Sequence, residues 1–281
     1  MHHDDHRTAL PTGHDELEDH DKGLSHDLPT LVSRRRALGI LGGLGLAATV
    51  AGCSGDDATT SGSSSGSTVD VGEGEIPEET AGPFPGDGSN GVNVLTESGI
   101  VRSDITTSFG SSTTVAEGVP LTVRLRVLDV SDGGTGGGLG GAAVYLWHCD
   151  REGRYSLYSD GVTDENYLRG VQEADGDGYV NFTSIYPAAY SGRWPHIHFE
   201  VYPSIDDATS ASNKLRTTQL ALPEDVSRRV YATDGYGAST ANLDQTSLDR
   251  DMVFSDGYSL QMAKVTGAVD SGLTATLNVP V

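Results

Sequence analysis

The chain is poor in cysteine, in aromatic residues and in cations, and each shortage narrows the class of protein. It has 281 residues but only two cysteines, Cys53 and Cys149, and 6% aromatic residues. With only these two cysteines, far apart along the chain, a scaffold held together by several disulfides is excluded. The folded part must therefore be stabilised by packing of its side chains.

Cations are scarce as well. The sequence contains 18 Lys and Arg against 40 Asp and Glu, which gives a formal net charge of -22. A surface this acidic repels phosphate backbones, so nucleic acid is excluded as a partner. Long apolar runs are also missing. The stretch 37–51 is Gly-rich and about half the length that a bilayer span requires.

The N-terminal segment is typical of an export signal. Ser33 precedes three arginines, the apolar stretch follows, and "VAGC" ends at Cys53. The arginines resemble a twin-arginine signal and "VAGC" resembles a lipobox, with Cys53 as the lipidated residue. We therefore expect a signal peptide at 1–52, a flexible Ser/Gly-rich tether at 53–75 and a folded domain at 76–281. This organisation predicts an exported protein, either lipid-anchored through Cys53 on the extracellular face of the membrane or secreted.

Helical periodicity is nearly absent from the predicted domain, and strand patterns take its place. Residues 120–130 alternate apolar and polar side chains, as a half-buried strand does. Similar runs, separated by Gly- and Asp-rich loops, lie at 142–150, 178–187, 196–203, 214–223 and 273–281. One short helix is expected at 223–232, and 168–172 is expected in a loop. The pattern predicts an all-β sandwich of mostly antiparallel strands with long functional loops.

Histidines are concentrated outside this domain, which makes one pair within it notable. Only three of the nine histidines follow residue 26, and two of them, His196 and His198, flank Ile197 in "RWPHIHFEVY". On a strand, alternate residues point to the same face, so both imidazoles project together. Taken alone, the pair is either two solvent-facing polar side chains on an exposed strand or half of a metal site.

Neighbouring motifs carry a family resemblance. "GAAVYLWHCDREGRYS", "YLRGVQEADGDGYVNFTSIYPAAY", "RWPHIHFEV" and "TTQLALP" occur in this order, with "PEETAGPFP" upstream. Together they resemble the intradiol ring-cleavage dioxygenases, ferric non-haem enzymes that split catechols between the two hydroxyls. The resemblance implies four iron ligands: Tyr155, Tyr190, His196 and His198.

This ligand set suits the chemistry of iron in its ferric state. Fe(III) is a hard cation that favours anionic oxygen, and imidazole suits it as a nitrogen ligand. By resemblance, the catechol binds as a dianion and displaces Tyr190, which takes one of its protons. Arg193 and Gln219 match family residues that line the pocket, and a fixed cation such as Arg193 helps where negative charge develops. The implied partners are a catechol-type substrate and O2, and the implied product is a cis,cis-muconate.

Two alternatives remain open from the residues alone. The domain could be a surface-anchored lipoprotein that binds a metal or ligand without turnover, or a copper or zinc protein that uses the two histidines. Cytosolic relatives carry a helical dimerisation region where this chain has its tether, so we expect a monomer. Cys149 is expected to be buried and inert, and Trp147 to lie in the core.

Overall fold

The computed structural model describes residues 74–131 and 136–281. The predicted signal peptide, Cys53 and nearly all of the predicted tether lie outside the described residues. Inside them, the predicted start of the domain is held in place. Ile76 is fully buried in the main core and donates its N–H to the carbonyl of Pro280 at 2.8 Å.

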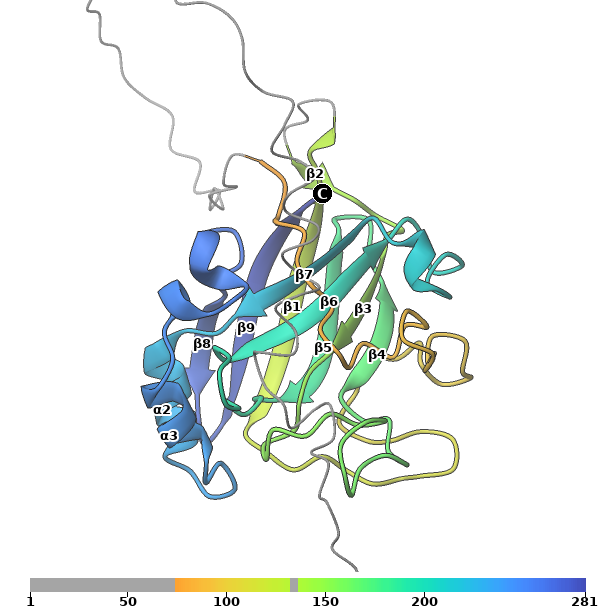
Figure 1. The fold of residues 1–281 in the computed structure, drawn as a ribbon. Coiled ribbons are helices and arrows are strands. Elements are labelled where there is room, and N and C mark those ends of the chain that lie inside the picture. The colour runs from red at the N-terminus through yellow and green to blue at the C-terminus, as the bar shows by residue number, and fades with distance from the viewer. Residues whose placement is uncertain (1–73, 132–135) are drawn as a thin grey trace, which may run out of the picture. The chain divides into compact units, whose positions relative to one another are not determined.

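Two sheets form the molecule (Figure 1). The five-stranded sheet contains β1 (Pro120–Asp129), β2 (Gly137–Gly138), β5 (Tyr179–Ile185), β8 (Lys264–Ala268) and β9 (Gly272–Pro280). Within it only β1 and β9 run parallel. The four-stranded sheet is antiparallel throughout, in the order β4 (Arg169–Glu173), β3 (Ala143–Trp147), β6 (His196–Tyr202) and β7 (Arg216–Ala221).

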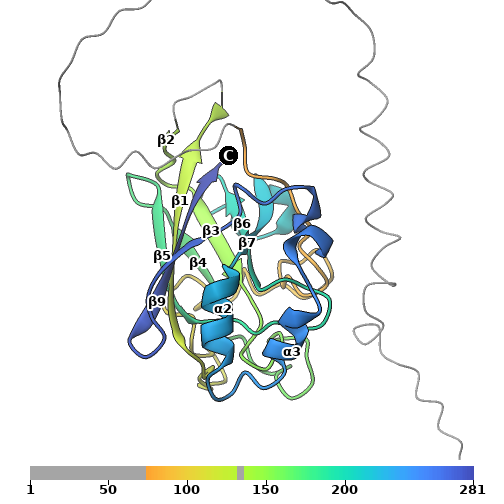
Figure 2. The ribbon, with the colours of Figure 1, turned by 90° about the vertical axis from the view of Figure 1, so that its left-hand side faces the viewer.

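Helices are few and short. The described ones are α2 (Glu224–Tyr231), α3 (Ser239–Asp244) and the 3-10 turns Ala211–Asn213, Leu248–Arg250 and Phe254–Asp256. α2 starts directly after Pro223 and buries Val226, Val230 and Tyr231 in the main core. α2 and α3 lie together at one edge of the sandwich (Figures 1 and 2). None of the described helices has the length and apolar character needed to cross a membrane.

The prediction of an all-β sandwich is confirmed, since all six predicted strands and the helix at 223–232 are present. The expected loop at 168–172 is wrong, because Arg169–Glu173 is strand β4. This segment has no apolar alternation. It forms a strand because it pairs with β3, and Gly170 leaves room for the packing, since a Cβ there would lie 2.5 Å from the Ile105 side chain.

The main core lies between the two sheets. Leu121, Val123 and Leu125 of β1 and Ile197 and Phe199 of β6 are all at most 1% exposed. Each such side chain contributes roughly 1.5–3 kcal/mol relative to an exposed one. Ile197 thus faces the core, as the strand period predicts.

A second apolar cluster lies on the other side of the four-stranded sheet. It includes Tyr145 and Trp147 of β3 and Tyr202 of β6, and it is covered by segments from 81–109 and 149–157. Because β6 alternates, His196 and His198 point to this side while Ile197 points to the main core. The whole of β6 is therefore buried, and the two histidines lie beneath loops rather than on an exposed face.

Candidate metal centre

Four side chains from separate parts of the chain converge beneath these loops. Tyr155 Oη lies 3.3 Å from Tyr190 Oη, which lies 3.1 Å from His196 Nε2. His196 Nε2 in turn lies 3.1 Å from His198 Nε2. These are the four residues that the sequence predicts as metal ligands. The structure brings them into one buried cluster of two oxygens and two nitrogens.

Tyr155 is presented by a tight turn after β3. The buried Asp150 carboxylate accepts hydrogen bonds from the backbone N–H groups of Glu152 and Arg154, both at 2.9 Å. Gly153 takes φ +88° within this turn, a conformation that favours glycine. The turn therefore directs Tyr155, which is 3% exposed, back over the sheet.

Tyr190 lies in the loop that enters β6. Helix α3 supports this loop, because Asn242 Nδ2 donates to the Ala189 carbonyl at 2.9 Å and Ser239 Oγ accepts from the Ala189 N–H at 3.2 Å. A Cβ at Gly153 would lie 3.4 Å from Tyr190 Cβ. The turn that presents Tyr155 therefore packs directly against the second tyrosine.

The two imidazoles are oriented by different means. His196 Nδ1 donates to the Trp194 carbonyl at 2.5 Å, which leaves a lone pair on Nε2. His198 Nδ1 is buried and has no hydrogen-bond partner among the described residues. Its ring stacks on Trp147 instead, at 4.9 Å between centroids and 10° between planes, and Trp147 stacks on Tyr145. Stacking therefore fixes the His198 ring where a hydrogen bond fixes that of His196.

A buried guanidinium lies next to the cluster. Arg193 Nη1 is 3.5 Å from His196 Nε2, and Arg193 Nη2 donates to Gln219 Oε1 at 2.6 Å. Gln219 stands directly opposite His198 in the β6–β7 register and donates its amide to the Thr80 carbonyl. The structure thus places both predicted pocket residues beside the predicted ligands.

Asp251, which the sequence analysis did not single out, holds Arg193. Its carboxylate, fully buried, accepts from Arg193 Nε at 2.9 Å and Nη2 at 3.3 Å. It also accepts from the backbone N–H groups of Trp194 at 2.6 Å and Val253 at 2.9 Å. Nothing in the sequence around Asp251 distinguishes it from the other Asp residues of its segment. Its pairing with Arg193 is therefore visible only in the fold.

Burial keeps the cluster uncharged while no cation is bound. Burial raises the pKa of Tyr155 well above its usual value and that of Tyr190 to about 12, the latter against the opposing effect of Arg193. Burial and the Arg193 charge hold the pKa values of His196 and His198 well below their usual value. At neutral pH the two phenols are protonated and the two imidazoles are neutral.

The donor set fits a hard trivalent cation. Two phenol oxygens and two imidazole nitrogens face one another, and deprotonation of both phenols would supply anionic oxygen. In the part of the chain that the structure describes, no group of three or more His, Cys, Asp or Glu side chains could hold a metal ion. A metal at the His pair would therefore take the tyrosine oxygens rather than a carboxylate.

Three other residues of the sequence motifs, His148, Cys149 and Arg169, are buried and form hydrogen bonds with protein groups other than the four predicted ligands. His148 lies between Ser184 Oγ at 2.7 Å and the Cys149 carbonyl at 2.8 Å. Cys149 is buried, as predicted, and burial raises the pKa of its thiol. Arg169 is fully buried and donates to the carbonyls of Phe84 and Pro85, so it fastens the segment that covers the site.

Comparison with known proteins agrees with these motifs. Residues 100–206 match the family model described as Dioxygenase, a range that includes Tyr155, Tyr190, Arg193, His196 and His198 but not Gln219. Among solved structures, the chain is similar to an intradiol ring-cleavage dioxygenase from Tetranychus urticae. The two share 24% identity over 66% of this chain and 87% of that chain, with a TM-score of 0.54. The predicted resemblance to intradiol ring-cleavage dioxygenases is confirmed.

Two further solved structures are similar at lower scores. One is the dioxygenase domain of a dioxygenase carbohydrate-binding protein fusion from Streptomyces sp. SirexAA-E, with 21% identity over 74% of this chain and 98% of that chain and a TM-score of 0.45. The other is hydroxyquinol 1,2-dioxygenase from Pseudomonas putida DLL-E4, with 18% identity over 73% of this chain and 66% of that chain and a TM-score of 0.44. The likeness to the Tetranychus urticae structure, at 24% identity and a TM-score of 0.54, shows the fold alone, and the site must be argued from its own residues.

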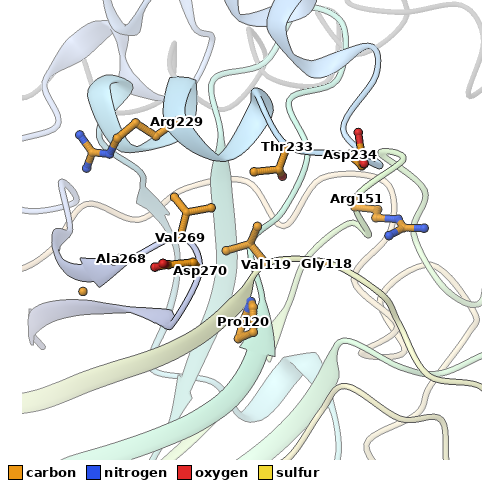
Figure 3. Close-up of a pocket in the computed structure, with 11 residues that line it drawn as sticks. Gly118, Val119, Pro120, Arg151, Arg229, Thr233, Asp234, Ala268, Val269 and Asp270 are labelled. Atoms are coloured by element: carbon orange, nitrogen blue, oxygen red, sulfur yellow. The ribbon is translucent and has the colours of Figure 1, made fainter.

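A surface cleft of about 760 Å³ lies elsewhere, between the start of β1, the end of α2 and the β8–β9 turn. In Figure 3 the side chains of Arg151 and Arg229 point away from Val119 at its floor. Both arginines are already paired, Arg151 with Glu117 at 2.7 Å and Arg229 with Asp225 at 2.9 Å. None of the predicted ligands lines this cleft, and it plays no part in the proposed function.

Proposed function

We propose that this protein is a non-haem Fe(III) dioxygenase that cleaves the ring of catechol-type aromatics between the two hydroxyls with O2. One observation carries the proposal: the hydroxyls of Tyr155 and Tyr190 and the Nε2 atoms of His196 and His198 form one buried cluster. The order of these residues along the chain matches the family motifs. The product is of the cis,cis-muconate type.

Tyr155, Tyr190, His196 and His198 would hold the iron. When bound, Fe(III) would activate a coordinated catechol dianion for reaction with O2. Two phenolates would supply negative charge that a buried trivalent ion requires, and the neutral imidazoles would add none. Because His196 Nδ1 is committed to the Trp194 carbonyl, only its Nε2 is available as a ligand atom.

Tyr190 is suited to take a proton from the substrate. It is partly buried and lies in a loop, whereas Tyr155 is almost fully buried within its turn. Burial raises the pKa of the Tyr190 phenol to about 12, so a released Tyr190 phenolate would be a strong base in this site. One catechol proton would thereby stay on a group next to the reacting centre.

Arg193 would supply fixed positive charge. Asp251 and Gln219 hold its guanidinium on one side, and its Nη1 lies 3.5 Å from His196 Nε2. A cation held in place in a water-poor site stabilises developing negative charge without reorganisation. We assign Arg193 to the substrate oxygens and Gln219 to the orientation of Arg193.

The export signal predicted from residues 1–52 gives this enzyme an extracellular address, on the membrane through Cys53 or secreted. Its substrates would then be catechols available outside the cell. The chain is proposed to act as a monomer, because the sequence predicts a tether, rather than a helical dimerisation region, before the domain.

Iron loading followed by O2 uptake tests the proposal. The loaded chain should be red-brown through phenolate-to-Fe(III) charge transfer, and it should consume O2 with catechol, protocatechuate or a hydroxyquinol. Tyr155→Phe should weaken the colour markedly, whereas Tyr186→Phe is the matched control, because Tyr186 is a fully buried tyrosine bonded to Ser227 instead.

The outcomes separate the candidate functions. A colourless protein that retains no iron refutes the metal centre. A coloured protein that consumes no O2 with any catechol supports a binding lipoprotein without turnover. Equal loss of colour in Tyr155→Phe and Tyr186→Phe would show that the ligands are assigned wrongly.

A further inference from the structure

The outward side of the five-stranded sheet has a composition unlike the rest of the chain. We call it the outer face. It consists of the outward positions of four strands: Thr122, Arg124 and Arg126 of β1, Tyr179, Asn181 and Thr183 of β5, Lys264 and Thr266 of β8, and Thr274, Thr276 and Asn278 of β9. In Figure 2 this side is turned to the left, and no described helix covers it.

Strand register aligns these side chains into rows across the sheet. Asn181, Arg124, Thr276 and Lys264 stand opposite one another in turn, from β5 through β1 and β9 to β8. Neighbouring strands lie about 4.8 Å apart, so the row forms a polar strip across the sheet. Within this row, Thr276 separates the cations Arg124 and Lys264.

The outer face is cationic in a chain that is otherwise strongly acidic. The charged residues at these strand positions are Arg124, Arg126 and Lys264, in a chain with a net charge of -22, and the exposed Asp104 borders the face where it bridges Thr183 at the β5 edge. Within residues 74–131 and 136–281, none of these three cations takes part in an ion pair, whereas the exposed Arg228 and Arg229 both do. The face therefore offers three cations that form no ion pair with the described residues.

Two of the cations are held in position. The Arg124 guanidinium lies 4.1 Å from the centroid of the Tyr179 ring and that of Arg126 lies 5.2 Å from it. Arg126 Nε also donates to the Asp177 carbonyl at 3.1 Å. Side chains fixed in this way lose less freedom when they bind a partner, so they are suited to recognise one.

Several partners fit this face poorly. Membrane insertion needs apolar side chains, and the exposed large hydrophobic residues of the described chain, Val92, Val101, Val115 and Leu215, all lie elsewhere. A symmetric contact with a second copy would bring cations against cations. Duplex nucleic acid carries a charge about every 1.7 Å, a higher charge density than that of a polymer with one carboxylate per sugar, so the acidic remainder of the molecule would repel it more strongly.

We infer that the outer face binds an extended anionic polysaccharide, with one carboxylate per sugar for the guanidinium and ammonium groups. A guanidinium pairs well with a carboxylate, and the Thr and Asn side chains between the cations can exchange hydrogen bonds with sugar hydroxyls. The outer face lies across the sandwich from the candidate metal centre, so this inference does not depend on the proposed dioxygenase activity.

Affinity electrophoresis of the whole chain tests the inference, with polygalacturonate, dextran or duplex DNA in the gel. The wild type should be retarded by polygalacturonate alone, and less so as NaCl rises. The variant Arg124→Gln/Arg126→Gln/Lys264→Gln should bind about 10- to 30-fold more weakly, since each exposed contact is worth a few-fold. The control Arg228→Gln/Arg229→Gln/Arg250→Gln makes the same change in net charge and should bind like the wild type.

Three results would overturn the inference. They are a wild type that polygalacturonate does not slow, an equal loss of binding in both triple variants, and retardation by DNA or dextran as strong as that by polygalacturonate. Equal losses would mean that net charge, rather than the outer face, governs the interaction. Circular dichroism of both variants checks that each is folded; none of the six side chains is buried, so both are expected to fold.

Discussion

The role of Asp251 beside the candidate centre can be tested by measuring the free energy of unfolding, without any assay of activity. Its buried carboxylate accepts hydrogen bonds from Arg193 and from the backbone N–H groups of Trp194 and Val253. Both of its oxygens face donors only. In Asp251→Asn one oxygen becomes an NH2 group, which then opposes N–H donors whichever way the amide is turned.

The size of the effect follows from burial. Arg193 is 8% exposed and Asp251 0%. Removing one partner of a buried pair typically costs about 3–5 kcal/mol, because the other charge stays buried without compensation. We therefore expect Asp251→Asn to lower the free energy of unfolding by about that amount.

Urea denaturation at pH 7 measures this difference, with Asp244→Asn as the control. Asp244 pairs with Arg228 at 2.7 Å, but both side chains are about half exposed, so the loss there should be below about 1 kcal/mol. Replacing both members of the buried pair, in Arg193→Met/Asp251→Leu, should recover part of the stability. Equal, small losses in Asp251→Asn and Asp244→Asn would refute the conclusion that Asp251 holds Arg193 as a buried ion pair.

Three further predictions concern the surroundings of the centre. Trp147→Leu removes the ring stacked on His198 and should weaken iron binding about tenfold or more, as measured by competition with a chelator. Gly153→Ala should lower stability by about 1–2 kcal/mol because of its positive φ, and it should also alter the charge-transfer band, because relief of that strain would shift the turn that presents the proposed ligand Tyr155. Gly161→Ala, also at positive φ but with open space around it, should leave that band unchanged. Burial lowers the pKa of His148 from 6.5 to about 4, so between these values the unfolded chain takes up a proton that the folded chain refuses, and stability falls as the pH falls. His148→Gln should remove roughly 2–2.5 kcal/mol of this acid sensitivity in urea melts at pH 7 and pH 4.5, and an unchanged dependence would refute the assignment.

The local sequence was sufficient to predict the side-chain orientation of a residue wherever the secondary structure of its own segment determines that orientation. The alternation in 196–203 correctly places Ile197 in the core and both imidazoles on the opposite face, because strand geometry alone decides this. Local sequence failed for β4, whose five residues show no apolar alternation. That strand exists because β3 offers a partner and because Gly170 fits against Ile105, and neither condition can be read from the segment itself.

The same distinction divides the residues of the centre. Tyr155, Tyr190, His196 and His198 stand in motifs, whereas two of the groups that hold the surrounding side chains in place lie far along the chain from the residues that they contact. Asp251 reaches Arg193 across 58 positions and Trp147 reaches His198 across the β3–β6 register. Replacing such a support should change the properties of the centre while the four proposed ligands remain present. These supporting residues determine how precisely the four proposed ligands are oriented. Chains that share the motifs can therefore differ at the supporting positions, and through them in the affinity of the proposed site for iron and in the reaction rate.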